Sequence, residues 1–224
     1  RDDPALAAEV RGFAGQEVLH ASAHERHIRL LEEQGYEVRS FLRLYEFVAF
    51  RILERIFPAN VRLATTAAAE HFTAIMAENF LVEGARLEGI HPAMRDLLGW
   101  HASEEIEHRA VAFDVLARVD PRYSTRMIGL AIATTTLAGF WLLGSLHLFS
   151  QEDEKLAKLR REGAEFMERQ PFGERVFGRG IRRYLEPVFH PLDHRGRLRD
   201  VWGAHLRGRC PEFSAGPVAT LQPA

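Results

Sequence analysis

The spacing of apolar side chains along this chain is that of helices almost throughout. Apolar residues recur at intervals of three and four, which is the period of an amphipathic helix, and no stretch shows convincing strand alternation bounded by hairpin turns. Proline and glycine residues mark where the segments begin and end. The pattern predicts four successive helices, over residues 4–34, 37–57, 59–87 and 92–117.

Residues 127–150 depart from this amphipathic pattern, because they contain no Asp, Glu, Lys or Arg. A helix of that length can span a hydrocarbon core of ~30 Å. A helix buried inside the protein, or one at an oligomer interface, would show the same composition. The sequence therefore leaves open membrane contact through 127–149, burial of this helix, and a homodimer.

The rest of the chain predicts an amphipathic, highly charged helix over 152–170, followed by a tail that proline and glycine interrupt. The last residues, 211–224, have the composition of a disordered end. We therefore expect three parts: a helical bundle over 1–125, an apolar helix over 126–150, and an amphipathic helix with an irregular tail over 151–224.

Charge and cysteine content narrow the class of protein. A formal net charge of -2 over 224 residues argues against a nucleic-acid-binding protein, which would need a basic surface. The one cysteine, Cys210, excludes an internal disulfide and a multi-cysteine zinc site, and it fits a reducing compartment. We expect a cytoplasmic protein, associated with the inner membrane if 127–149 contacts lipid.

A Glu-x-x-His motif lies on the first predicted helix. It consists of Glu17 and His20, and His24 follows one turn later. At about 100° per residue, these three side chains lie within roughly 60° of one another on the helix surface. Phe13 and Leu31 share that face, which is therefore expected to point into the core, where ionisable groups need partners.

A second Glu-x-x-His motif, Glu105 and His108, lies on the fourth predicted helix, and Glu70 stands among small apolar residues on the third. Two such helices, with single glutamates from two others, build the di-iron or di-manganese site of ferritin-like bundles. We therefore predict an all-α, ferritin-like four-helix core that holds two iron ions, with manganese as the alternative, because carboxylate-rich sites favour these metals. The predicted ligands are Glu17, His20, Glu70, Glu105 and His108.

Four further residues accompany the predicted ligands. His24, His71 and His101 are candidates for catalytic groups or for residues that hold the ligands in orientation. His24 and His101 are also candidates for additional ligands. Glu104 precedes His108 by four residues, so spacing alone does not decide whether Glu104 or Glu105 binds the metal. The repeated i, i+3 spacing favours Glu105.

The ferritin-like arrangement requires one more glutamate, on a helix before Glu17. We expect this glutamate to lie upstream of Arg1. Glu46 and Glu54 are the alternative, but they belong to a polar stripe with neighbouring arginines and are expected to be solvated.

Three segments together resemble a bacterial family, the predicted metal-dependent hydrolases, which is similar to ferritin-like di-metal proteins. They are GQE-x-x-H-x-x-x-H at 15–24, EHFTA at 70–74 and WHASEEIEH at 100–108. The resemblance extends from about Pro4 to about His194 and implies a helical bundle with its metal at the five ligands named above. In the family pattern a Pro-x-Gly-Glu motif lies upstream, and this chain departs from the family by lacking it.

The sequence favours an oxidoreductase among three interpretations. In that interpretation a di-iron centre uses O2 and an electron donor to oxidise a small or lipophilic organic substrate. The first alternative is a metal-dependent hydrolase that uses a metal-activated water, with zinc as its candidate metal. The second alternative is a metal-binding bundle without catalytic activity. The sequence identifies neither the substrate nor the oligomeric state.

Overall fold

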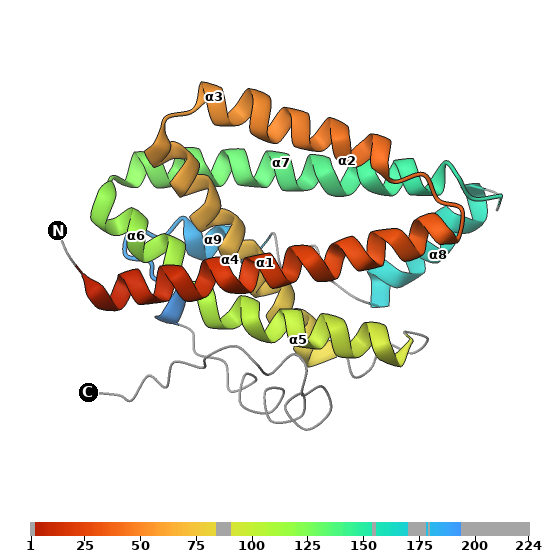
Figure 1. The fold of residues 1–224 in the computed structure, drawn as a ribbon, viewed down its shortest axis with the longest axis horizontal. Helices are drawn as coiled ribbons and strands as arrows, with labels where there is room; N and C mark the ends of the chain where they lie inside the picture. Colours follow the sequence, from red (N-terminus) through yellow and green to blue (C-terminus); the bar gives the residue numbers. More distant parts are fainter. Residues whose placement is uncertain (1–2, 84–90, 154–155, 170–177, 179, 194–224) are drawn as a thin grey trace.

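The computed structural model is an all-α bundle, as the apolar spacing predicts (Figure 1). No strand occurs among the residues that the structure describes. These residues are 3–83, 91–153, 156–169, 178 and 180–193.

The first helix, α1 (Pro4–Glu33), runs along the length of the molecule in Figure 1. Its start is fixed locally, because Asp3 Oδ1 accepts a hydrogen bond from the backbone N–H of Leu6 at 3.0 Å and proline needs no N–H partner in the first turn. Its end is also local. Gly35 adopts a φ of 98°, a left-handed conformation that turns the chain out of the helix.

The helix predicted over 37–57 is present as a rod of three consecutive segments. These are α2 (Arg39–Glu46), the π-helical η1 (Phe47–Leu53) and α3 (Glu54–Ile56). The rod lies beside a later helix, α7 (Tyr123–Phe149), on one side of the bundle in Figure 1.

The central helix is α4 (Ala59–Glu83), which packs against the three helical segments that follow it in the fold. Its fully buried side chains include Ala64, Ala67 and Ala68, which are small enough for another helix to come close. On α7, a Cβ added at Gly129 would overlap the backbone of Ala64, so this crossing requires glycine. The predicted helix extends to 87, and residues 84–90 lie outside the described residues.

The prediction of one continuous helix over 92–117 is wrong, because the structure has two helices in this range. α5 (Pro92–His108) ends in a short turn, after which α6 (Val111–Val119) begins. In the turn, the buried Arg109 donates a hydrogen bond from Nη1 to Glu78 Oε1 on α4 at 2.8 Å. No proline or glycine marks this break, so the apolar pattern continues through it and a tertiary contact accompanies the change of direction.

The apolar segment forms α7, whose two halves differ. Gly129, Leu130 and Ala133 in the first half are buried against the bundle. Among the described residues, α7 is the helix long and apolar enough to cross a membrane, and 17% of its most apolar 18-residue window is buried. The described residues therefore do not bury this helix along its whole length. The second half exposes Trp141, Leu142, Leu143, Leu146 and Phe149.

Three elements end the described part of the chain. They are α8 (Leu156–Arg169), α9 (Gly180–Tyr184) and the short 3-10 helix η4 (Pro191–Asp193). Of these, α9 packs against α4. Tyr184 is fully buried and joins Phe72 of α4 in the main apolar core. The predicted disordered end, 211–224, lies outside the described residues.

Candidate metal centre

The two Glu-x-x-His motifs meet between α1 and α5. Glu17, His20, Glu105 and His108 each offer one ligand atom, and these four atoms lie within 4.8 Å of one another. His20 Nδ1 is 3.5 Å from Glu17 Oε1 and 3.6 Å from Glu105 Oε1, and His108 Nε2 is 3.4 Å from Glu17 Oε1. The structure thus brings together four of the five predicted ligands in one cluster, hereafter the metal cluster.

Each residue of the metal cluster has a buried polar atom without a hydrogen-bond partner among the described residues. These atoms are Glu17 Oε1, His20 Nδ1, Glu105 Oε2 and His108 Nε2. Buried polar atoms are normally satisfied, and each exception needs a physical reason. Four such atoms, all of metal-ligand types and one on each residue of the metal cluster, fit a bound cation, which would give them a partner.

Both histidines of the cluster are held from behind by a carboxylate. His20 Nε2 is 2.9 Å from Glu104 Oε2, and His108 Nδ1 is 3.0 Å from Glu70 Oε2. This is the arrangement in which a carboxylate fixes the orientation of a metal-binding imidazole and raises its basicity. The structure therefore places Glu70, expected as a ligand, and Glu104, considered as one, against the far nitrogens of the two histidines.

The carboxylates set the protonation of the two histidines in the absence of metal. Burial opposes the charged form of His20, but the hydrogen bond with Glu104 and the nearby Glu17 carboxylate outweigh burial and raise its pKa to about 9. Burial likewise opposes a charge on His108, and the hydrogen bond with Glu70 reverses the effect and raises its pKa. Burial raises the pKa of Glu70 itself.

His101 and His24 extend the cluster along its α1–α5 side. His101 Nε2 is 2.8 Å from Glu105 Oε1, and the His101 ring centroid is 4.0 Å from that of His20. His24 follows, with its ring centroid 4.9 Å from that of His101. Desolvation and then the neighbouring His101 lower the pKa of His24, so its imidazole is neutral at physiological pH.

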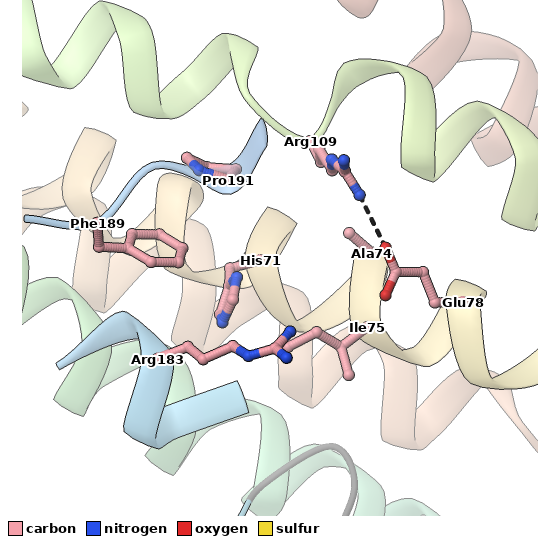
Figure 2. Close-up of a pocket in the computed structure, with 8 residues that line it drawn as sticks. All are labelled: His71, Ala74, Ile75, Glu78, Arg109, Arg183, Phe189 and Pro191. Atoms are coloured by element: carbon pink, nitrogen blue, oxygen red, sulfur yellow. Dashed lines mark hydrogen bonds and ion pairs between the residues drawn. The ribbon is translucent and has the colours of Figure 1, made fainter. Parts of the chain in front are cut away.

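His71 does not face the metal cluster. Although it follows Glu70 in sequence, it points to the other side of α4, where its Nε2 donates a hydrogen bond to the Gly180 carbonyl at 2.9 Å. Figure 2 shows it between Arg183 and Phe189. The three residues line a small pocket with a volume of about 30 Å³. Burial lowers the pKa of His71 to about 4. The structure thus separates this candidate catalytic residue from the other two.

The remaining carboxylates considered for the fourth position lie elsewhere. Glu46 on α2 and Glu54 on α3 are exposed, as the polar stripe predicts, and neither belongs to the metal cluster. The cluster opens to solvent on the side of Glu17, whose side chain is 40% exposed, whereas the side chains of His20 and His108 are 3% exposed.

Two aromatic residues of the site were not anticipated from the sequence. Trp100 meets His20 edge-on at 5.2 Å between ring centroids, and Phe13 lies 4.9 Å from His108. Phe13 shares the α1 face of Glu17, and Trp100 precedes His101 directly, so adjacency to the motifs was the available signal. The two rings pack against the two histidines of the metal cluster.

The fold and the site together define an all-α protein with a buried Glu2His2 metal-binding cluster. The family model of the predicted metal-dependent hydrolases matches residues 2–195, so the chain belongs to this family. No curated protein and no solved structure matches the chain.

Proposed function

We propose that this protein is a metal-dependent hydrolase whose divalent ion is held by Glu17, His20, Glu105 and His108. The observation that carries the proposal is that four residues of metal-ligand type bring their ligand atoms within 4.8 Å of one another, and each has a buried atom without a hydrogen-bond partner among the described residues. Membership of the predicted metal-dependent hydrolases supports hydrolysis as the reaction class.

The hydrolase was the first alternative from the sequence, and it now replaces the oxidoreductase as the preferred interpretation. No observation supports oxidase chemistry, and membership of the family supports the hydrolase. Ligand atoms within 4.8 Å of one another suit a single ion, with two nitrogen and two oxygen donors. We therefore propose zinc as the first metal to test, and iron and manganese, the metals that the sequence favours, as the next.

The residues around the cluster have distinct parts in this proposal. A divalent ion at the cluster would acidify water and polarise the electrophilic group of a substrate. Glu70 and Glu104 hold the two histidines in orientation through their far nitrogens. His24, with its lowered pKa, is the neutral imidazole that accepts a proton, and His101 lies between His24 and the cluster.

The experiment is to purify the protein without added metal and count zinc, iron and manganese per chain. The same preparation is then assayed against chromogenic carboxylate esters, phosphate esters and amides. We expect about one redox-inert ion per chain and hydrolysis of one of these classes. Two irons per chain with absorbance that changes on reduction and O2 addition would contradict the proposal and restore the oxidoreductase.

Matched variants test the residues. Glu105→Gln removes a ligand charge and is expected to lower the metal content and abolish hydrolysis. Glu107→Gln makes the same chemical change two residues away, on an exposed part of α5, and is expected to retain both metal and activity. Equal metal content in the two variants would show that the cluster does not hold the ion. His24→Ala should retain metal and lose most of the hydrolytic rate.

We also propose that the exposed apolar face of the rod α2–α3 and of α7 contacts a lipid surface. On the rod, Phe47 and Phe50 are exposed between Arg43 and Arg51, which are exposed too. Apolar rings flanked by arginines match an anionic membrane surface. A homodimer through this face is the other outcome that the sequence leaves open, and size-exclusion chromatography with light scattering distinguishes the two.

A further inference from the structure

A second cavity lies away from the metal cluster, where α6, the start of α7 and the segment after α9 meet. Its volume is about 290 Å³, close to the lower end of the range for small-molecule sites. None of its lining residues belongs to the metal cluster. Its wall is largely apolar, formed in part by Phe113, Leu116, Tyr123, Val188 and Phe189.

Arg126 of α7 lines this cavity and is 93% buried, since its exposed fraction is 7%. Its guanidinium carbon lies 5.0–6.0 Å from the ring centroids of four aromatic residues, so the rings stabilise its charge in part. Its Nη2 donates a hydrogen bond to the Glu186 carbonyl. Arg126 is thus fixed in position with its charge inside the protein.

Arg126 has no counter-ion among the residues that the structure describes. No carboxylate forms an ion pair with it there, and its Nε is buried without an acceptor. A buried charge is costly unless it is paired, so a site of this kind favours an anion that completes the pairing.

The nearest carboxylate of the cavity wall is already engaged. Asp120 accepts two hydrogen bonds from the Arg122 side chain, at 2.7 Å each, one from the Arg122 backbone N–H at 3.3 Å, one from Asn60 at 2.7 Å and one from Thr125 at 2.8 Å. The charges of Asp120 and Arg122 cancel each other. The charge that remains in the cavity wall is therefore the positive charge of Arg126.

We propose that this cavity binds a small organic carboxylate with a flat, apolar body. The carboxylate pairs with the free donors of Arg126, and the body lies against Phe113 and Phe189. Arginine suits this ligand because its planar group presents several donors to a carboxylate. The proposal is independent of the reaction at the metal cluster, because it rests on different residues.

The test is isothermal titration calorimetry on the full chain, as purified with its metal, with benzoate and 3-phenylpropionate as probes. Benzamide, the neutral analogue of benzoate, and inorganic phosphate are the comparison ligands. We expect one site per chain for the carboxylates. Benzamide should bind at least about tenfold more weakly than benzoate, because it lacks the charge. Equal binding of benzoate and benzamide, or no binding of either carboxylate, would overturn the proposal. Phosphate that binds as well as benzoate would overturn the requirement for an apolar body.

Three variants locate the site. Arg126→Met is expected to weaken benzoate binding by about tenfold or more, because it removes a charged donor. Arg118→Met is the matched control, since Arg118 is an exposed arginine on α6 that pairs with Asp3, and its removal should leave benzoate binding unchanged. Ala117→Phe fills the cavity from its exposed rim without altering Arg126, and it should also abolish binding.

Ala117→Phe keeps the proposal testable if Arg126→Met does not fold, because Ala117 lies on the surface. Circular dichroism and metal content verify that each variant is intact. Benzoate could instead bind at the metal, and it would then bind normally to both Arg126→Met and Ala117→Phe. That result would overturn the proposal.

Discussion

The metal cluster and the second half of α7 depart from the usual distribution of side chains in opposite directions. Between α1 and α5, four ionisable residues meet, three of them buried, and each has a buried polar atom without a hydrogen-bond partner among the described residues. On α7, Trp141 and Leu142 are more than half exposed. Buried polar groups and exposed apolar groups are the two observations that most often indicate function rather than folding.

The comparison teaches that each departure calls for a different kind of partner. The unpartnered carboxylate and imidazole atoms fit a cation, because a positive charge compensates several acceptors at one point. The exposed apolar side chains need an apolar surface, because water is their unfavourable neighbour. The same helix also shows the normal pattern, since the first half of α7 is buried against the bundle.

The largest expected effect distinguishes the two halves of α7. Gly129→Ala should lower the free energy of unfolding by about 1–3 kcal/mol, because its new methyl group would overlap the Ala64 backbone. Gly139→Ala should raise it by roughly 0.5–1 kcal/mol, because nothing lies within 4 Å of the new methyl group and alanine favours the helix. Urea denaturation measures both. A loss of stability in Gly139→Ala would show that the second half is covered in solution.

A smaller effect concerns the carboxylates behind the cluster. Glu70→Gln should weaken metal binding by about 10–100-fold while the ligands remain, because His108 loses the carboxylate that orients it. Competition with a chromogenic chelator measures the affinity. Glu78→Gln on the same helix is the control, since Glu78 pairs with Arg109 outside the cluster. A complete loss of metal in Glu70→Gln would instead identify Glu70 as a direct ligand.

The pH dependence of metal binding follows from the pKa of His20. Because this pKa is raised to about 9 without metal, His20 is protonated at pH 7, and the ion must displace its proton. Metal affinity should therefore rise with pH, by about tenfold per unit between pH 7 and 9 for this one group. Chelator competition at pH 6, 7, 8 and 9 measures the slope. An affinity independent of pH over this range would show that His20 is not a ligand.

The smallest effect on stability belongs to the exposed leucines of α7. Leu142→Ser and Leu146→Ser should each change the free energy of unfolding by no more than about 0.5 kcal/mol, because neither side chain is buried. The two substitutions together should weaken sedimentation with phosphatidylglycerol vesicles. Leu19→Ser is the control, because Leu19 is an exposed leucine on α1, and it should leave vesicle binding unchanged. Unchanged vesicle binding in the double variant would argue against lipid contact through α7.

Much of this architecture could be predicted because its signals are local. The start of α1 at Asp3 and its end at Gly35 depend on a side-chain cap and a left-handed glycine, which sequence spacing reveals. The two Glu-x-x-His motifs could be paired because spacing of three residues places both side chains on one helix face. The turn at Arg109 could not be predicted, since its visible contact is with Glu78, 31 residues earlier.

By itself, the sequence determined the all-α class, the ends of the first helix, and the residue types that converge on the metal cluster. Periodicity, capping and spacing depend on residues within a few positions of one another, so a short stretch of sequence reveals them. Only the tertiary structure decided that Glu70 lies behind His108, that His71 faces a different pocket, and that the second half of α7 is exposed. The first two depend on how α4 is rotated, and the third depends on what packs beside α7, and residues distant in sequence set both.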